Sequence, residues 1–335
     1  FGNDGYMGTA ITKRGNKKLT WETTSEFNIG LDLGFFDNRI SLSMEYYNRI
    51  ISDLLVSNKS LPAYNEINTI AANIGKTQGR GFELTLSTVN IMNKDWTWST
   101  DFTFYTFKDN WYERDPNWKP AAYESKKDPI RSYYSYVSDG LLQVGEKAPA
   151  WQPTLVPGQI KLKNLYDTGT SPNVLDQYDK VNLGSQDPKC TLGLNNTLRY
   201  KNLNFNIYFY GEIGRLRGAS YYDAWIVGLG NSLTNVSQQS LHSYTNANQN
   251  TTVPNLIESA YDFGDYYHKK INYLRCRNIT LGYTIPVSKS IANSVRISAN
   301  VSNPFVFTNW NGVDPETDTG NFSYPNVTSF SFGID

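Results

Sequence analysis

Residues 27–47 read FNIGLDLGFFDNRISLSMEYY, a stretch in which apolar and polar side chains alternate twice. Every second residue is apolar in 27–35, and the same period returns in 40–46. Successive side chains of a β-strand point to opposite faces, so each run predicts a strand with one apolar face and one polar face. Asp37 and Asn38 lie between the two runs and are typical of a tight turn. The stretch therefore predicts an antiparallel β-hairpin.

The same alternation recurs along the rest of the chain and predicts an all-β fold. Seven further segments show it, at 82–87, 96–104, 192–200, 203–209, 279–285, 295–301 and 330–334. Uninterrupted apolar runs are far shorter than the about 20 residues that a membrane-spanning helix needs. The chain carries 31 basic and 31 acidic side chains and is 39% apolar. This composition excludes a disordered chain and provides no basic surface for a nucleic-acid partner.

Charged residues are distributed unequally between the two faces of these nine segments. None occurs on the apolar parity, whereas six occur on the opposite parity. A charged side chain on the lipid face of a barrel costs roughly 2 to 4 kcal/mol at mid-depth for Arg or Lys, so this exclusion favours lipid on the apolar side. The alternative is a soluble sandwich whose apolar face packs on a second sheet. The six predicted lumen-facing charges are Asp32, Glu45, Glu83, Asp101, Arg199 and Arg296.

Connection length alternates along the chain between short turns and long loops. The long connections are 57–80, 109–188, 212–272 and 303–326. Outer-membrane barrels have short periplasmic turns and long extracellular loops, and their strand number is usually even. The pattern therefore predicts an antiparallel transmembrane β-barrel with four extracellular loops. Nine strands alone do not close such a barrel, so we expect further strands to precede residue 1 or to come from another chain.

Short motifs follow one another along nearly the whole chain. They are LTWETT at 19–24, NIGLD at 28–32, YYNR at 46–49, GRGFEL at 79–84, PGQIK at 157–161, DPK at 187–189, YLR at 273–275, NITLGY at 278–283 and GVDPE at 312–316. In this order they resemble the SusC-like (SusC/RagA) TonB-dependent outer-membrane transporters of Bacteroidetes. The resemblance implies that residues 1–335 form about nine C-terminal strands of a barrel of about 22. It also implies that the N-terminal plug, the TonB-binding segment and the earlier strands lie outside this sequence.

The resemblance implies a nutrient importer in the outer membrane of a Gram-negative cell. A SusD-like lipoprotein lid would capture a glycan or peptide oligomer over the extracellular mouth, and energy delivered through TonB would rearrange the plug. Two alternatives stay open, namely a soluble β-sandwich that binds carbohydrate and an outer-membrane scaffold barrel that transports nothing. We expect no enzyme and no catalytic residues, because the sequence has no nucleophile elbow and no phosphate loop.

Aromatic side chains are concentrated in the predicted extracellular loops. Ring faces pack on sugars, on peptides or on a partner protein, so these residues are candidate contacts for ligand or lid. The alternative is that the rings pack on one another and fold the loops. The candidates are Trp111, Tyr112, Trp118, Tyr134, Trp151, Tyr222, Trp225 and Trp310.

One loop is a candidate calcium site, on the resemblance alone. In many relatives an Asp-rich segment with the ligand spacing of calcium follows the Pro-Gly-x-Ile-Lys motif. Here the candidate ligands are Asn164, Asp167, Asp176 and Asp179. Residues 169–173 lengthen the loop, and the compact ligand run of the relatives is missing, so a solvated acidic loop is the alternative. We expect no other cofactor.

Overall fold

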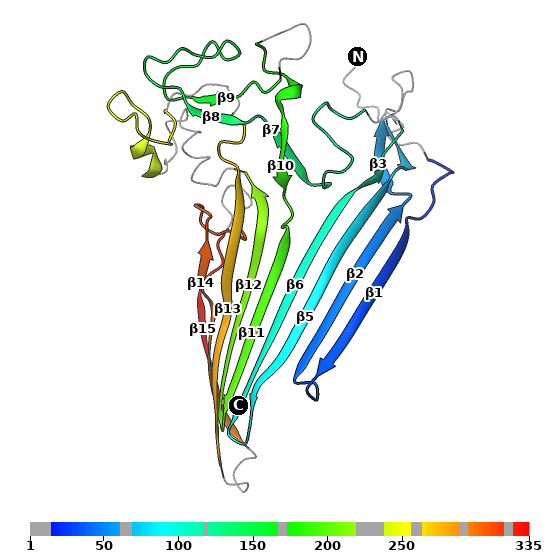
Figure 1. Ribbon diagram of the computed structural model, residues 1–335, viewed down its shortest axis with the longest axis vertical. Coiled ribbons are helices and arrows are strands. Elements are labelled where there is room, and N and C mark those ends of the chain that lie inside the picture. Colours follow the sequence, from blue (N-terminus) through cyan, green and yellow to red (C-terminus); the bar gives the residue numbers. More distant parts are fainter. Residues whose placement is uncertain are drawn as a thin grey trace, which may run out of the picture.

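The computed structural model describes residues 15–60, 69–116, 119–166, 173–218, 238–255, 263–287, 294–317 and 324–334. Figure 1 shows one large sheet with a group of smaller elements beyond one end of it. The large sheet has nine strands in the order β1-β2-β5-β6-β11-β12-β13-β14-β15, so its strands lie side by side in chain order. All neighbouring pairs are antiparallel. The nine strands are β1 Thr23–Phe35, β2 Ile40–Ser52, β5 Lys76–Met92, β6 Trp96–Glu113, β11 Cys190–Tyr200, β12 Leu203–Arg217, β13 Lys269–Ile285, β14 Val295–Thr308 and β15 Ser329–Ile334.

These nine strands contain all nine segments that the alternation predicts. The first hairpin turn is tight because Asp37 and Asn38 both adopt left-handed backbone conformations, with φ of 54° and 61°. Such conformations are uncommon for residues other than glycine, but Asn and Asp adopt them more readily than most. No described helix is long and apolar enough to cross a membrane.

Apolar residues of neighbouring strands lie side by side and form continuous rows across one face of the sheet. This face is open: Ile29 is 60% exposed and Phe332 is 83% exposed. Within the described part of the chain no second sheet packs on it, which leaves the soluble sandwich without the layer it requires. One row runs from β1 to β12 through Leu33, Leu42, Leu86, Phe102, Leu194 and Phe209.

Five of the strands, namely β5, β6, β12, β13 and β14, extend into the predicted long loops. The ends of the predicted loops 109–188 and 212–272 are strand, because β6 continues to Glu113, β12 to Arg217, and β13 begins at Lys269. β-Bulges disturb the pattern here. Arg277 is an extra residue in β13, so the apolar parity moves from Ile279 to Cys276. Strict alternation therefore ends before the strands do.

The long connections contain small sheets of their own. Within 57–80, β3 (Leu55–Ser60) pairs with β4 (Thr69–Asn73). Within 109–188, β7 (Ser132–Ser135) pairs with β10 (Val181–Ser185), and β8 (Ser138–Leu141) pairs with β9 (Ile160–Leu162). Two short 3-10 helices are η1 (Gln177–Asp179) and η2 (Gln238–His242).

Candidate functional site: the polar face and the loop unit

Described parts of the two longest connections fold into one compact unit, which we call the loop unit and define as residues 136–162, 243–255 and 263–267. Its core consists of Leu141, Ile160 and Leu162 from the first segment and Tyr244 and Tyr267 from the second. Figure 1 shows it beyond the ends of β12 and β13.

Hydrogen bonds join the two segments of the loop unit. Asp265 Oδ1 accepts from both the backbone N–H and the hydroxyl of Ser138, at 2.7 and 2.6 Å. The Tyr244 hydroxyl accepts from the backbone N–H of Val144 at 3.0 Å. Buried apolar contacts and these hydrogen bonds give the loops a defined shape.

Three of the aromatic candidates stabilise the loops. The Tyr134 hydroxyl donates to Asp128 at 2.7 Å, and its ring centroid lies 5.1 Å from that of Tyr123. Burial, reinforced by the Asp128 carboxylate, raises the pKa of Tyr134 to about 12. Trp151 Nε1 donates to the Leu162 carbonyl at 2.7 Å, and Trp310 is 7% exposed. For these residues the structure fits loop folding, which was the alternative to ligand contact.

The other aromatic candidates divide into two groups. Trp111 and Tyr112 lie on β6 itself, where Arg114 covers the Trp111 ring at 5.3 Å and Tyr112 is 57% exposed. Tyr112 is thus the most exposed ring among the described candidates. Three candidates lie outside the described residues, namely Trp118, Tyr222 and Trp225.

The strand register places all six predicted lumen-facing charges on the face opposite the apolar rows, here called the polar face. Glu45 and Glu83 lie directly across from each other on β2 and β5, and Asp32 lies on the same face of β1. Arg199 Nε donates to the Lys201 carbonyl at 3.2 Å, and the Arg296 guanidinium lies against Gly282.

Asp101 belongs to a ladder of polar side chains that crosses the polar face. It accepts from the Ser87 hydroxyl at 2.8 Å and from the Asn195 amide at 3.5 Å. Asn206 donates to the Asn195 carbonyl oxygen at 2.7 Å. Nearby, the hydroxyls of Tyr47 and Tyr105 are 2.8 Å apart. The polar face thus presents hydroxyl, amide and carboxylate groups that are hydrogen-bonded to one another.

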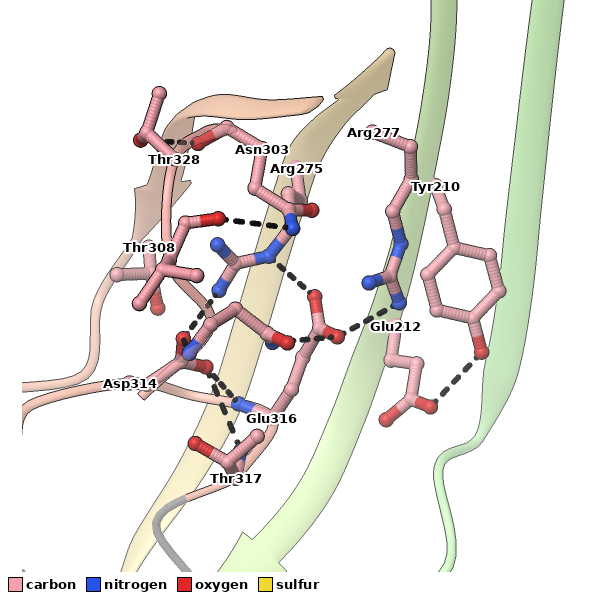
Figure 2. A network of polar contacts seen from close by, with 12 residues as sticks. Tyr210, Glu212, Arg275, Arg277, Asn303, Thr308, Asp314, Glu316, Thr317 and Thr328 are labelled. Atoms are coloured by element: carbon pink, nitrogen blue, oxygen red, sulfur yellow. Dashed lines mark hydrogen bonds and ion pairs between the residues drawn. The ribbon is translucent and has the colours of Figure 1, made fainter. Parts of the chain in front are cut away.

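Sequence reasoning missed a buried ion-pair network between β13 and the connection that follows β14 (Figure 2). The Arg275 side chain is 4% exposed and pairs with Asp314, from Nη2 to Oδ2 at 2.9 Å. Its Nε pairs with Glu316 Oε1 at 2.6 Å. Arg277, the bulge residue, pairs with the other oxygen of Glu316 at 2.6 Å. We call these four residues the Arg275 network.

Backbone groups complete this network. Asp314 Oδ1 accepts from the Glu316 N–H at 2.8 Å, and Oδ2 accepts from the Asn326 N–H at 3.0 Å. A buried charge is tolerated only where it is paired and hydrogen-bonded, and here both conditions hold. The network therefore fixes residues 314–316 and 326 against the end of β13. Three of its four residues, Arg275, Asp314 and Glu316, come from the YLR and GVDPE motifs, which carried the resemblance without indicating that they meet.

A second charged group lies beside the Arg275 network on the same face. Glu212 is 7% exposed, pairs with Arg215 at 2.6 Å and accepts from the Tyr210 hydroxyl at 3.0 Å. Arg277 lies 5.0 Å above the Tyr210 ring and so connects the two groups. Charged residues thus lie together where β12 and β13 reach the loops.

The candidate calcium loop is organised by one buried carboxylate. Asp179 is 0% exposed, which contradicts a fully solvated acidic loop. Its Oδ1 accepts from the N–H groups of Leu165 and Tyr166 at 2.6 and 3.0 Å, and its Oδ2 accepts from that of Asp176 at 2.9 Å. Asn164 lies in this loop, and Asp167 lies outside the described residues. Calcium binding stays a prediction, since the described residues contain no group of three or more His, Cys, Asp or Glu placed to hold a metal.

Comparisons with known proteins agree with this architecture. A family model described as TonB dependent receptor-like, beta-barrel matches residues 1–304. TonB-dependent receptor P3 of Formosa agariphila is 29% identical over 99% of the chain, and TonB-dependent receptor SusC of Bacteroides thetaiotaomicron is 28% identical over 99%. The chain spans 36% and 33% of the lengths of these relatives.

Solved structures show the same fold. The structure of the RagAB peptide transporter matches 100% of the chain with a TM-score of 0.77 at 24% identity, and the match covers 37% of that chain. The RagAB peptide importer in its open-open state gives a TM-score of 0.79 at 23% identity and covers 36% of that chain. The chain therefore belongs to the TonB-dependent receptor family, as a SusC-like part of an outer-membrane β-barrel.

Proposed function

We propose that this chain forms the C-terminal part of an importer of the SusC type, which takes up glycan or peptide oligomers with a SusD-like lipoprotein lid and with energy from TonB. One observation carries the proposal: a single sheet has an open apolar face and a hydrogen-bonded polar face, and folded loops cover one end of it. Family membership supports it. The names of two relatives point the same way, one being a TonB-dependent receptor SusC and the other a peptide transporter.

The two faces of the sheet would contact different surroundings. Open rows of aliphatic and aromatic side chains suit hydrocarbon, and a polar face with Asp32, Glu45 and Asp101 suits a water-filled lumen. The loop unit would stand at the extracellular mouth, where lid and ligand arrive. Because Tyr134, Trp151 and Trp310 hold the loops together, we assign ligand contact first to Tyr112, whose ring is open to solvent.

The proposal is tested in the full-length receptor, expressed in its source bacterium after deletion of the gene. We expect the receptor in the detergent-extracted outer-membrane fraction, co-purification of a surface lipoprotein, and restored uptake of labelled glycan or peptide oligomers. Deletion of the TonB-binding segment should abolish uptake and leave membrane insertion intact. Recovery of the receptor in buffer without detergent, or unchanged uptake after that deletion, would contradict the proposal.

The ligand contact has its own test. Tyr112→Ala should lower the uptake rate, whereas Tyr178→Ala should leave it unchanged, because Tyr178 is a comparably exposed ring (47%) that is not a candidate. Equal uptake by both variants would remove Tyr112 from the site.

A further inference from the structure

A cavity of about 400 Å³ lies where β6 and β11 cease to pair. The last paired residues are Tyr105 on β6 and Thr191 on β11, yet β6 continues to Glu113. The segment between β10 and β11 passes this gap and is held to β6 by the Thr106 hydroxyl, which donates to the Lys189 carbonyl at 2.6 Å. The cavity is therefore part of the barrel wall and separate from the loop unit.

Three lysines line this cavity, namely Lys108, Lys189 and Lys270. All three are exposed, and none makes an ion pair with the described residues. Two carboxylates also line it. Asp187 is already paired with Arg131 at 2.6 Å, and Asp109 accepts from the Ile130 N–H at 3.3 Å. Positive charge is thus in excess around the cavity.

Two of the three lysines that line the cavity lie on the outward face, just beyond the apolar rows. Lys108 has the same parity as Phe104 on β6, and Lys270 has the same parity as Leu274 on β13. Arg80 on β5 lies directly beside Lys108 on that face and adds a fourth positive charge. At this height a transmembrane barrel passes from hydrocarbon into the headgroup layer.

We propose that this cavity binds a phosphate-bearing headgroup of the surrounding outer leaflet. Lysine ammonium groups are compact charges that bind phosphate from several directions, and basic residues at a membrane surface attract anionic lipid. A lipid headgroup fits better than free phosphate, because the basic residues continue along the outward face from Lys270 and Lys108 to Arg80. The lipid would hold the separated strands together from outside the barrel.

The test uses the full-length receptor purified in detergent and native mass spectrometry with bisphosphorylated lipid A. The variant Lys108→Gln/Lys189→Gln/Lys270→Gln keeps the aliphatic stems and removes three charges. We expect its lipid A affinity to fall by about fivefold for each lysine, on the order of 100-fold in total. The matched control is Lys126→Gln/Lys127→Gln/Lys147→Gln, which removes three exposed charges from the loops, and its affinity should equal that of the wild type.

Dephosphorylated lipid A should bind all variants equally weakly. The single variants Lys108→Gln and Lys270→Gln keep the inference testable if the triple variant fails to insert, and each should lose about fivefold. Wild-type affinity in the triple or single variants would overturn the proposal, as would an equal loss in the control. Displacement of lipid A by millimolar inorganic phosphate would overturn the lipid assignment and make soluble phosphate the ligand.

Discussion

Replacing Asp314 by alanine is expected to release residues 309–317 and 324–328 from the end of β13. Asp314 is 3% exposed and is paired with Arg275, whose side chain is 4% exposed. Removing one partner of a buried ion pair costs about 3 to 5 kcal/mol, because the other charge stays buried without its counterion. We expect the lower end, about 3 kcal/mol, since Glu316 remains 2.6 Å from Arg275.

A loss of about 3 kcal/mol corresponds to roughly 100-fold more frequent opening, at about 1.4 kcal/mol for each factor of ten. Hydrogen–deuterium exchange of the full-length receptor in detergent measures this opening segment by segment. The backbone N–H groups of Glu316 and Asn326 donate to Asp314 and lose this acceptor in every variant at this position, so the opening is measured at the other backbone N–H groups of the two segments. The strands of the sheet should exchange at their wild-type rates.

Two further variants test whether the effect of Asp314→Ala comes from the burial of the ion pair. Glu146→Ala breaks the Lys161–Glu146 pair, in which the Glu146 side chain is 37% exposed, and should change exchange in the loop unit by about fivefold at most. Arg275→Met/Asp314→Leu replaces the buried pair by apolar side chains and should recover much of the loss. The reasoning is refuted if Asp314→Ala exchanges like the wild type, or if the double variant is no more protected than the single one.

Four further outcomes follow from the structure. The hydrogen bonds that Glu146 accepts from Lys161 and from the Gln143 N–H lower its pKa, so its contribution to the loop unit is present above the unfolded pKa and is lost as pH falls through the folded pKa. Protection of residues 141–162 against exchange, corrected for the intrinsic exchange rate, should therefore fall with acid in the wild type and fall less in Lys161→Met, which keeps the hydrogen bond from Gln143. Tyr134→Phe removes the hydrogen bond to Asp128 and should destabilise β7 by about 1 kcal/mol in the same assay, whereas Tyr112→Phe should have no effect. Asp179→Asn should loosen residues 173–180 equally in calcium and in EGTA, because Asp179 accepts three backbone N–H groups; a larger loss in calcium would instead support a calcium site. Gly81→Ala would place a Cβ 2.5 Å from the Tyr47 ring and displace that ring from Tyr105. The free energy of unfolding, measured in urea, should fall by about 1 to 3 kcal/mol. An unchanged free energy would show that the ring moves aside at no cost.

The sequence predicts the membrane-facing part of this fold well, because lipid on one side and water on the other impose strict alternation. Residues 27–47 show this most clearly, and their hairpin is confirmed by the pairing of Ile29 with Tyr46. Beyond the apolar rows both faces of a strand meet water or loops, so alternation no longer marks the strand. The bulge at Arg277 then shifts the parity of the apolar positions within β13, and the local composition does not predict this bulge.

The polar sites were harder to predict, because their residues meet through the fold. Arg275 and Asp314 are 39 positions apart in sequence, and their contact depends on how the connection after β14 returns to β13. The six charges of the polar face were found by parity, since register alone determines the face on which they lie. Residue type marks Trp151 as a candidate contact, but composition does not distinguish a ring that binds a ligand from one that closes a loop.

The two-part loop unit has a consequence for how the protein matures. Ser138 and Asp265 are 127 positions apart, and two complete membrane crossings, β11 and β12, lie between them. Bringing such distant segments together is entropically costly until the intervening strands hold their ends in place. The exterior cap would thus form late, after the wall beneath it has been inserted, and its protease resistance would report correctly completed biogenesis.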